Sequence, residues 1–203
     1  MTRGRWEVSA AIAHDRVLGI VRGEDAVSAR SAADALFDAG LRAAEVSLTT
    51  PGALSAIASL AGAGHLAGAG TVLDAPSAYA ALAHGARFLV CPVLAEDVVT
   101  VGHRHGAAVM AAASTPTEAL RALELGADLV KLFPARTWTP SALEDLLQAL
   151  PQLPLVPTGG IGVDDAREWI DAGAVAVGIG GALTAGGPAC ARERVAGLLE
   201  AIA

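Results

Sequence analysis

One unit of sequence recurs along almost the whole chain: a helix-like stretch, then a glycine, then a short apolar run. The glycines are Gly40, Gly64, Gly85, Gly106, Gly126 and Gly173. The first five stand at intervals of 20 to 24 residues, and the last interval is about twice as long. Glycine ends a helix readily because it adopts the left-handed backbone conformation, and a nearly continuous apolar run is typical of a parallel strand covered by helices. The repeat therefore indicates alternating helices and parallel strands.

Eight apolar runs fit this description and are predicted to be strands. They cover residues 17–21, 43–48, 66–72, 87–91, 107–111, 128–133, 155–158 and 175–179. Residues 5–14 are predicted to form a short helix before the first strand. Eight alternating units favour the α/β class and a closed (β/α)8 TIM barrel, as a single domain over residues 1–203. The alternative is an open, doubly wound sheet.

Composition narrows the functions that such a chain can have. Its 203 residues include 14 basic and 21 acidic side chains, for a net charge of −7. An acidic chain without a basic cluster is not expected to bind nucleic acid or anionic membranes. The chain has only two cysteines, so no disulfide framework is expected. This cysteine content predicts a cytoplasmic location. Residues 51–73 carry no charge but contain a proline and five glycines, which predicts a helix, a turn and a strand rather than a membrane span.

Lys131 is the only lysine in the chain, against 13 arginines. It lies in the middle of the predicted strand 128–133, where alternation turns Val130 and Leu132 toward the helices and Lys131 toward the inside of the barrel. A buried lysine can lose its proton near neutral pH, whereas arginine stays protonated. Because a neutral amine can attack a ketone and form a Schiff base, we predict that Lys131 is catalytic. The alternative is an inward lysine paired with a carboxylate for structure alone.

Glu45 is a second charged residue inside an apolar strand. Alternation places it on one face with Ser47 and Thr49, and it is expected to point inward, across the barrel from Lys131. A carboxylate beside an amine and a reacting carbon is a candidate general acid and base. A buried ion pair is again the alternative.

The predicted strand ends are rich in glycine, threonine and proline and nearly free of acids, which suits an anionic organic substrate at the active end of a barrel. Arg22 ends the first strand and is a candidate clamp for phosphate or carboxylate; the alternative is a rim arginine bonded to a neighbouring acid. The glycine loops after the seventh and eighth strands predict a phosphate cradle of backbone amides. No metal site is expected, because His103 and His105 lack acidic or cysteine neighbours and lie where a helix is predicted to end.

Four motifs occur in this order along the chain: Glu45-Val-Ser-Leu-Thr-Thr-Pro51, Gly68-Ala-Gly-Thr-Val72, Leu129-Val-Lys-Leu-Phe-Pro134 and Pro157-Thr-Gly-Gly-Ile161. With them, residues 18–183 resemble the KDPG/KHG aldolase family, which comprises 2-keto-3-deoxy-6-phosphogluconate aldolase and 4-hydroxy-2-oxoglutarate aldolase. The resemblance implies a (β/α)8 barrel, a class I aldolase that needs no metal or other cofactor, and a homotrimer.

The resemblance also implies a role for each site residue. Lys131 would form the Schiff base and Glu45 would shuttle protons. Thr71 would contact the pyruvate carboxylate, and Phe133 would pack beside the imine. The residues that would hold the phosphate are Arg22, Gly159, Gly160, Gly180 and Gly181.

The chain departs from the pattern of the family in three places. Thr49 stands where many members carry a carboxylate-binding arginine, and others carry threonine or asparagine. Gly181 stands where the family often has a serine that donates to phosphate. Ala111 and Ala112 replace a usual Pro-Gly pair. These departures concern the predicted phosphate site more than the predicted aldol reaction.

The predicted function is that of a lyase that reversibly cleaves a small 2-keto-4-hydroxy acid into pyruvate and an aldehyde. The expected substrates are 2-keto-3-deoxy-6-phosphogluconate and 4-hydroxy-2-oxoglutarate. Two alternatives stay open. One is another small-barrel phosphosugar enzyme, an isomerase, epimerase or synthase, that uses the glycine loops without Lys131 as a nucleophile. The other is a non-catalytic ligand-binding barrel.

Overall fold

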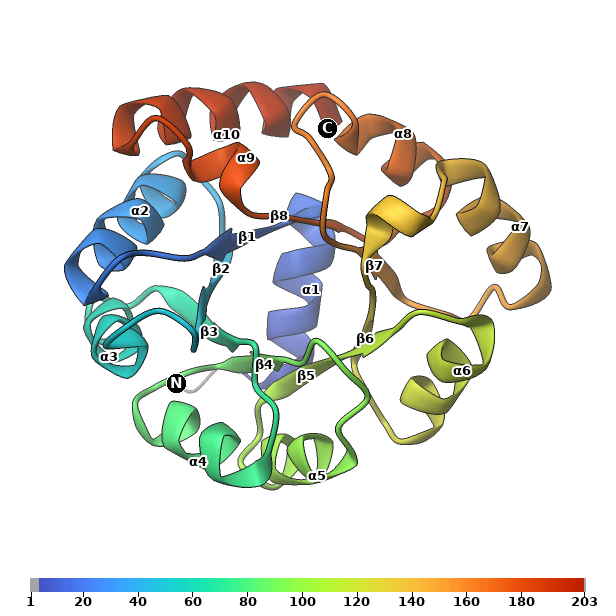
Figure 1. The fold of residues 1–203 in the computed structure, drawn as a ribbon, viewed down its shortest axis with the longest axis horizontal. Coiled ribbons are helices and arrows are strands. Elements are labelled where there is room, and N and C mark those ends of the chain that lie inside the picture. Colours follow the sequence, from blue (N-terminus) through green and yellow to red (C-terminus); the bar gives the residue numbers. More distant parts are fainter. Residues whose placement is uncertain (1–3, 203) are drawn as a thin grey trace.

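The computed structural model describes residues 4–202, which form a ring of eight parallel strands surrounded by helices (Figure 1). The strands are β1 (Val17–Val21), β2 (Ala43–Ser47), β3 (Leu66–Gly70), β4 (Phe88–Val90), β5 (Ala108–Ala113), β6 (Leu129–Leu132), β7 (Leu155–Pro157) and β8 (Val177–Ile179). Consecutive strands pair from β1 to β7, and β1 also pairs with β8. A bridge between Thr158 and Gly178 joins β7 to β8 and closes the ring. The (β/α)8 barrel is confirmed, and the open doubly wound sheet is wrong.

Helices connect the strands and form the outer layer. They are α1 (Arg5–Asp15), α2 (Ala26–Asp38), α3 (Ala53–Gly62), α4 (Ala75–Ala83), α5 (Glu96–Arg104), α6 (Pro116–Glu124), the 3-10 helix η1 (Ala135–Thr137), α7 (Pro140–Ala149), α8 (Ala166–Asp171), α9 (Gly181–Thr184) and α10 (Pro188–Ile202). Helices α2 to α8 each follow the carboxyl end of one strand and lead to the amino end of the next. No helix within residues 4–202 is long and apolar enough to cross a membrane.

The predicted elements differ from the observed ones only at their ends. The predicted N-terminal helix 5–14 is α1, one residue longer. Strand β3 ends two residues early because Thr71 turns out of the extended conformation with φ of 60°, and β8 begins two residues late, at Val177. Residues 1–3 and 203 lie outside the described residues, so a single domain over the full 1–203 stays a prediction.

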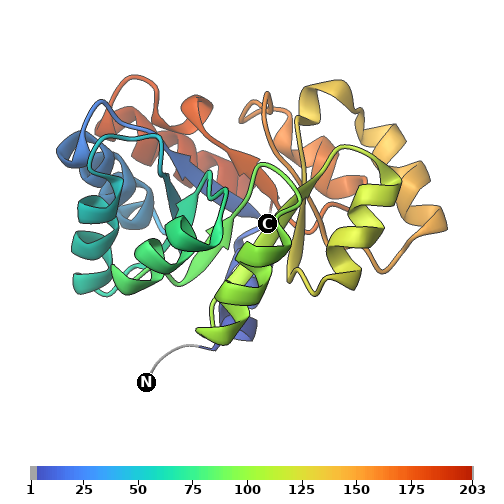
Figure 2. The ribbon, with the colours of Figure 1, turned by 60° about the horizontal axis from the view of Figure 1, so that its bottom comes forward.

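Helix α1 closes the barrel at the amino ends of its strands. It is visible through the middle of the ring in Figure 1 and at the lower end of the ring in Figure 2. Its buried residues Val8 and Ile12 pack in one cluster with inward side chains of the strands, including Leu18 and Phe88. The ring of Phe88 fills the space beside Gly68, where a Cβ atom would collide with it. Apolar packing therefore fills the interior of the barrel beneath α1, and the carboxyl ends of the strands remain for a site.

A buried aspartate fastens α1 to the barrel. The Asp128 side chain is only 2% exposed, and its Oδ1 lies 3.4 Å from Nε of Arg5 on α1. Its Oδ2 accepts hydrogen bonds from His103 Nε2 at 3.0 Å and from the Val109 backbone N–H at 2.9 Å. His103, in the last turn of α5, thus links this helix to the start of β6.

Replacing Asp128 with alanine is expected to lower the free energy of unfolding by about 2–3 kcal/mol, because Val109 N–H, His103 and Arg5 lose their common acceptor. Urea denaturation followed by circular dichroism measures the loss. Asp171→Ala is the matched control: Asp171 pairs with Arg167 on the surface, where a salt bridge contributes about 0–1 kcal/mol. Equal losses in the two variants would contradict the anchoring role of Asp128.

Candidate active site

Lys131 lies inside the barrel with its side chain almost fully buried. It is in phase on β6 with Leu129, which belongs to the interior cluster, whereas Val130 and Leu132 pack against the helices. The residue is 5% exposed, and Nζ lies 5.1 Å from the centroid of the Phe133 ring. None of the ion pairs found within residues 4–202 includes Lys131. The structural ion pair that was the alternative for this lysine is therefore not formed in the described chain.

Glu45 enters the barrel from β2, across the ring from Lys131. It is 1% exposed, and its Oε2 has no hydrogen-bond partner within the described residues. Burial raises the pKa of the Glu45 carboxyl, and the charges of Lys131 and Arg22 oppose part of that rise. The two predicted catalytic groups thus lie within electrostatic reach of each other, and burial favours the protonated form of the carboxyl.

The position of the Glu45 carboxylate depends on a glycine in the neighbouring strand. Gly70 pairs with Ser47 at the end of β3, and a Cβ atom on Gly70 would lie 2.7 Å from Cδ of Glu45 and still closer to Oε1. The atoms that would be displaced are at the end of a flexible side chain, so the fold can adapt by moving the carboxylate. The geometry of the site therefore constrains residue 70 more than the packing of the barrel does.

Substituting Gly70 with alanine is expected to reduce kcat/KM about 10- to 100-fold with little loss of stability, because the carboxylate moves away from its working position. Steady-state kinetics and thermal unfolding measure the two effects. Gly197→Ala is the control, since a Cβ atom on this α10 glycine meets nothing within 4 Å. If the two alanine variants are equally active, the position of the Glu45 carboxylate does not depend on Gly70.

Three hydroxyl groups form a chain beside Glu45. Ser47 Oγ lies 2.8 Å from both Thr49 Oγ1 and Thr71 Oγ1. Thr71 holds a φ of 60°, which is unfavourable for a β-branched residue, and its bond to the fully buried Ser47 fixes this conformation. Thr49 and Thr71 were predicted from the sequence to be site residues. For Ser47 the only prediction was that it lies on the same strand face as Glu45. These three hydrogen-bonded hydroxyl groups place donors at the ends of β2 and β3.

A cavity of about 480 Å³ opens at the carboxyl ends of β6, β7, β8 and β1. The predicted site residues in its lining are Arg22, Lys131, Phe133, Gly159, Gly160, Gly180 and Gly181. Glu45, Thr49 and Thr71 lie outside this lining, on the side of β2 and β3. The structure therefore separates the predicted residues into a cationic, glycine-rich end and a hydroxyl-rich end, with Lys131 and Glu45 carried by opposite sides of the ring.

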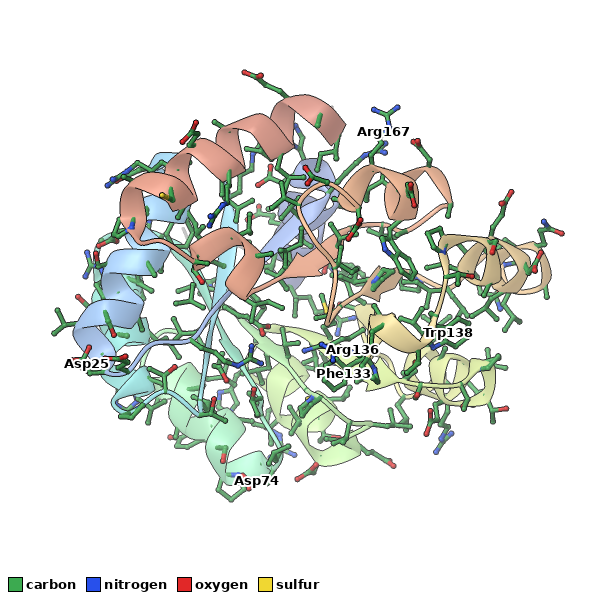
Figure 3. The ribbon with its side chains drawn as sticks, turned by 45° about the horizontal axis from the view of Figure 1, so that its top comes forward. Asp25, Asp74, Phe133, Arg136, Trp138 and Arg167 are labelled. Atoms are coloured by element: carbon green, nitrogen blue, oxygen red, sulfur yellow. The ribbon has the colours of Figure 1, made fainter. Side chains whose placement is uncertain are left out.

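The glycine loop after β7 packs on the loop after β6. Gly159 and Gly160 have φ values of 94° and 92°, which only glycine adopts without strain. A Cβ atom on Gly159 would lie 3.0 Å from the Phe133 ring. Figure 3 shows Phe133 next to Arg136, a cavity-lining residue that the sequence analysis missed. The signal for it was an arginine two positions after Pro134, at the end of the strand that carries Lys131.

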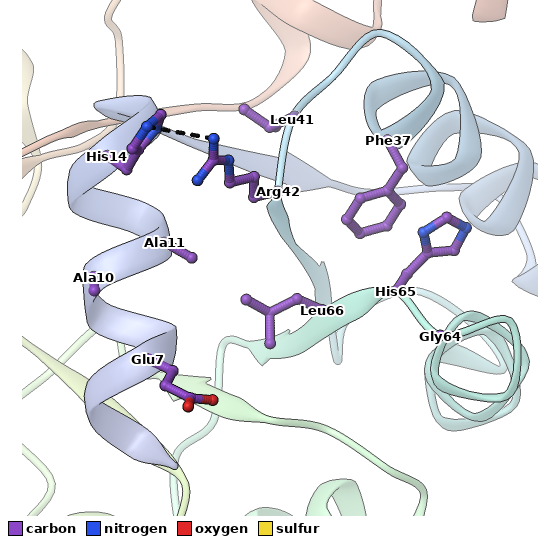
Figure 4. A pocket seen from close by; sticks show the side chains of 10 residues that line it. All are labelled: Glu7, Ala10, Ala11, His14, Phe37, Leu41, Arg42, Gly64, His65 and Leu66. Carbon is purple, nitrogen blue, oxygen red and sulfur yellow. Dashed lines mark hydrogen bonds between the residues drawn. The ribbon is translucent and has the colours of Figure 1, made fainter. Parts of the chain in front are cut away.

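A second cavity, of about 740 Å³, lies at the opposite end of the barrel, between α1 and the start of β3 (Figure 4). Two of its polar side chains contact neighbouring residues. Arg42 Nε lies 3.1 Å from Asp15, and His65 stacks on Phe37 with ring centroids 4.3 Å apart. None of the predicted site residues lines it, so the cavity at the strand carboxyl ends is the candidate active site.

Known proteins match this chain over most of its length. Residues 8–191 match the family model described as KDPG and KHG aldolase. The chain is 32% identical over 180 residues to the 2-dehydro-3-deoxy-6-phosphogalactonate aldolase of Escherichia coli, covering 87% of this chain and 88% of the relative. It is 36% identical over 163 residues to the 2-dehydro-3-deoxy-phosphogluconate aldolase of Treponema pallidum, covering 79% and 78%.

A solved structure links the same architecture to a covalent intermediate. The KDPG aldolase of Legionella pneumophila was captured with pyruvate as a covalent carbinolamine. This chain superimposes on it with a TM-score of 0.80 and 25% identity, over 96% of this chain and 97% of that chain. Residues 8–191, which match the family model, include every residue that lines the candidate active site.

Proposed function

Because the chain belongs to the KDPG and KHG aldolase family and is therefore an aldehyde-lyase, we propose that it cleaves a 2-keto-4-hydroxy acid reversibly into pyruvate and an aldehyde through a Schiff base on Lys131. The observation that carries this proposal is the environment of Lys131. Its side chain is buried in the barrel, lines the cavity at the carboxyl ends of the strands, and belongs to none of the ion pairs of the described chain.

Lys131 supplies the nucleophile. Its neutral amine attacks the C2 ketone of the substrate, and the carbinolamine loses water to give an iminium. The iminium then accepts the electron pair of the C3–C4 bond as that bond breaks. A carbinolamine with pyruvate in the L. pneumophila relative supports this first step. The ring of Phe133, 5.1 Å from Nζ, covers one side of the amine.

Glu45 moves the protons. As the C3–C4 bond breaks, its carboxylate takes the proton of the C4 hydroxyl, directly or through a water molecule, and the aldehyde leaves. The remaining enamine takes a proton on C3, and hydrolysis returns pyruvate and free Lys131. The raised pKa of Glu45 supports this role, because a carboxyl that titrates closer to neutral pH both accepts and returns a proton readily.

The two ends of the site match the two ends of an anionic substrate. Hydroxyl donors from Thr49 and Thr71 suit the carboxylate next to the ketone. Arg22 and the glycine loops at 159–160 and 180–181 suit a phosphate. The named relatives act on phosphorylated 2-keto-3-deoxy acids of the galactonate and gluconate series, and 4-hydroxy-2-oxoglutarate is the shorter candidate. The proposal includes a homotrimer and a cytoplasmic location, from family resemblance and composition.

Pyruvate release tests the proposal. The purified protein is incubated with 2-keto-3-deoxy-6-phosphogluconate, its C4 epimer and 4-hydroxy-2-oxoglutarate, and pyruvate is followed with lactate dehydrogenase and NADH. At least one of these acids is expected to be cleaved. If none releases pyruvate, while a phosphosugar is isomerised or pyruvate merely binds, one of the two alternative functions replaces the aldolase.

A further inference from the structure

We propose that Arg136 is a specificity-determining residue that favours a phosphorylated six-carbon substrate over the shorter dicarboxylate. The proposal rests on the aldol function proposed above and concerns only the far end of the substrate. Arg136 lies on η1, directly after the strand that carries Lys131, and lines the same cavity.

The backbone around Arg136 fixes the direction of its side chain. The N–H of Ala135 donates to Thr158 O at 2.8 Å, and the N–H of Arg136 donates to Gly159 O at 3.1 Å, so η1 is bonded to the loop after β7. The side chain then runs along the next glycine. A Cβ atom on Gly160 would lie 3.1 Å from Cβ and 3.2 Å from Nε of Arg136. The missing side chain at residue 160 leaves room for a guanidinium beside the loop backbone.

Arg22 faces the same loops from the other side. It follows β1, and its Nη1 lies 3.7 Å from a Cβ atom built on Gly180. Since β6, β7, β8 and β1 are consecutive in the ring, the two arginines flank the two glycine loops. Two guanidinium groups and the backbone amides of two loops suit the charge of a phosphate monoester, about −1.5 to −2, better than that of one carboxylate.

The two arginines are also unpaired. Other arginines, such as Arg42 and Arg167, form ion pairs with carboxylates, but within residues 4–202 neither Arg22 nor Arg136 does. Both are exposed at the cavity mouth of a chain whose net charge is −7. Acidic side chains that would neutralise them are abundant elsewhere on the surface and absent from the lining of this cavity. The cavity therefore offers two uncompensated positive charges to a ligand.

The two arginines lie at different depths. Arg22 is the residue directly after β1, whereas Arg136 stands four residues beyond the end of β6, on η1. Arg136 is therefore the outer of the two cations. The phosphate of a six-carbon substrate lies beyond C6, farther from the reacting bond than the C5 carboxylate of 4-hydroxy-2-oxoglutarate. Arg22 can serve both substrates, and Arg136 only the longer one.

The experiment compares Arg136→Gln and Arg136→Lys with the wild-type protein on three substrates: the two C4 epimers of the phosphorylated acid, and 4-hydroxy-2-oxoglutarate. For R136Q we expect kcat/KM on the preferred phosphorylated epimer to fall about 10- to 100-fold, chiefly through KM, because charged hydrogen bonds are lost. For R136Q acting on 4-hydroxy-2-oxoglutarate, kcat/KM is expected to stay within about twofold of the wild-type value. R136K is expected to lie between, since lysine keeps the charge but loses the paired donors.

Arg104→Gln is the control for the loss of one positive charge, because Arg104 is exposed in the last turn of α5, at the opposite end of the barrel. An equal loss on both substrate types, no loss on the phosphorylated acid, or a wild-type protein that cleaves only the dicarboxylate would overturn the proposal for Arg136. Failure of the aldol function itself is recognised separately, since borohydride would then trap no pyruvate on the wild-type protein.

Discussion

Replacing Lys131 with arginine is expected to abolish aldol cleavage, with kcat at least about 10,000-fold below that of the wild-type protein. Arginine keeps a long chain and a positive charge at the same place in the barrel, but it stays protonated and cannot form an imine. No acidic partner is orphaned by the change, because none pairs with Lys131 in the described chain. Pyruvate release from the best substrate measures the effect.

A second variant separates loss of chemistry from loss of fold. Lys131→Met has a similar length and removes the polar amine from a site that is 5% exposed. It is expected to be equally inactive and to unfold at a temperature no lower than the wild-type protein, since burial of a polar group without a hydrogen-bond partner is unfavourable. Turnover retained by either folded variant would remove Lys131 from the mechanism.

Glu45→Gln is expected to reduce kcat about 100- to 10,000-fold, which is the range for loss of a positioned acid and base. Glutamine has nearly the shape of glutamate and leaves Gly70 and the hydroxyl chain undisturbed. Formation of the imine with pyruvate depends on Lys131, so borohydride should still trap pyruvate on the variant. A loss of turnover smaller than tenfold would assign proton transfer to another group.

Glu45→Gln is also expected to change how the stability of the protein depends on pH. Burial raises the pKa of Glu45 in the folded protein, so the folded state holds this proton more tightly than the unfolded state. The contribution of Glu45 to stability is therefore fully present below its unfolded pKa of about 4.3 and is lost as pH rises through its higher folded pKa. Relative to E45Q, the wild-type protein is expected to lose stability over that interval, which urea denaturation at a series of pH values measures. A constant difference across the series would contradict the raised pKa.

The inward position of the two charged residues could be predicted from the sequence because strands alternate strictly. In the strand 128–133, the apolar side chains of Val130 and Leu132 face the helices, so the alternating side chain of Lys131 faces the interior of the barrel. Glu45 follows the same rule on β2. The closed ring could be predicted from the number of repeats, although the bridge between Thr158 and Gly178 that closes it involves no pattern of its own.

The features that sequence could not predict depend on local geometry outside the strands. Thr71 looked like a strand residue, and it turns into the left-handed region where a hydrogen bond to Ser47 holds it. Arg136 lies in a connection, where no periodicity fixes the direction of a side chain. Its approach to Gly160 follows from backbone hydrogen bonds between η1 and the loop after β7. Motifs therefore indicated the residues proposed for the reaction better than the residue proposed for specificity.

Trapping of pyruvate on the intact protein tests the central role of Lys131 most directly. The wild-type protein is mixed with pyruvate, reduced with sodium borohydride, digested and mapped by mass spectrometry. The expected result is one reduced pyruvate adduct on the peptide that contains Lys131, absent when borohydride or pyruvate is omitted and absent from K131R. An unmodified Lys131 peptide, or an adduct on the chain's terminal amine alone, would contradict a Schiff base inside the barrel.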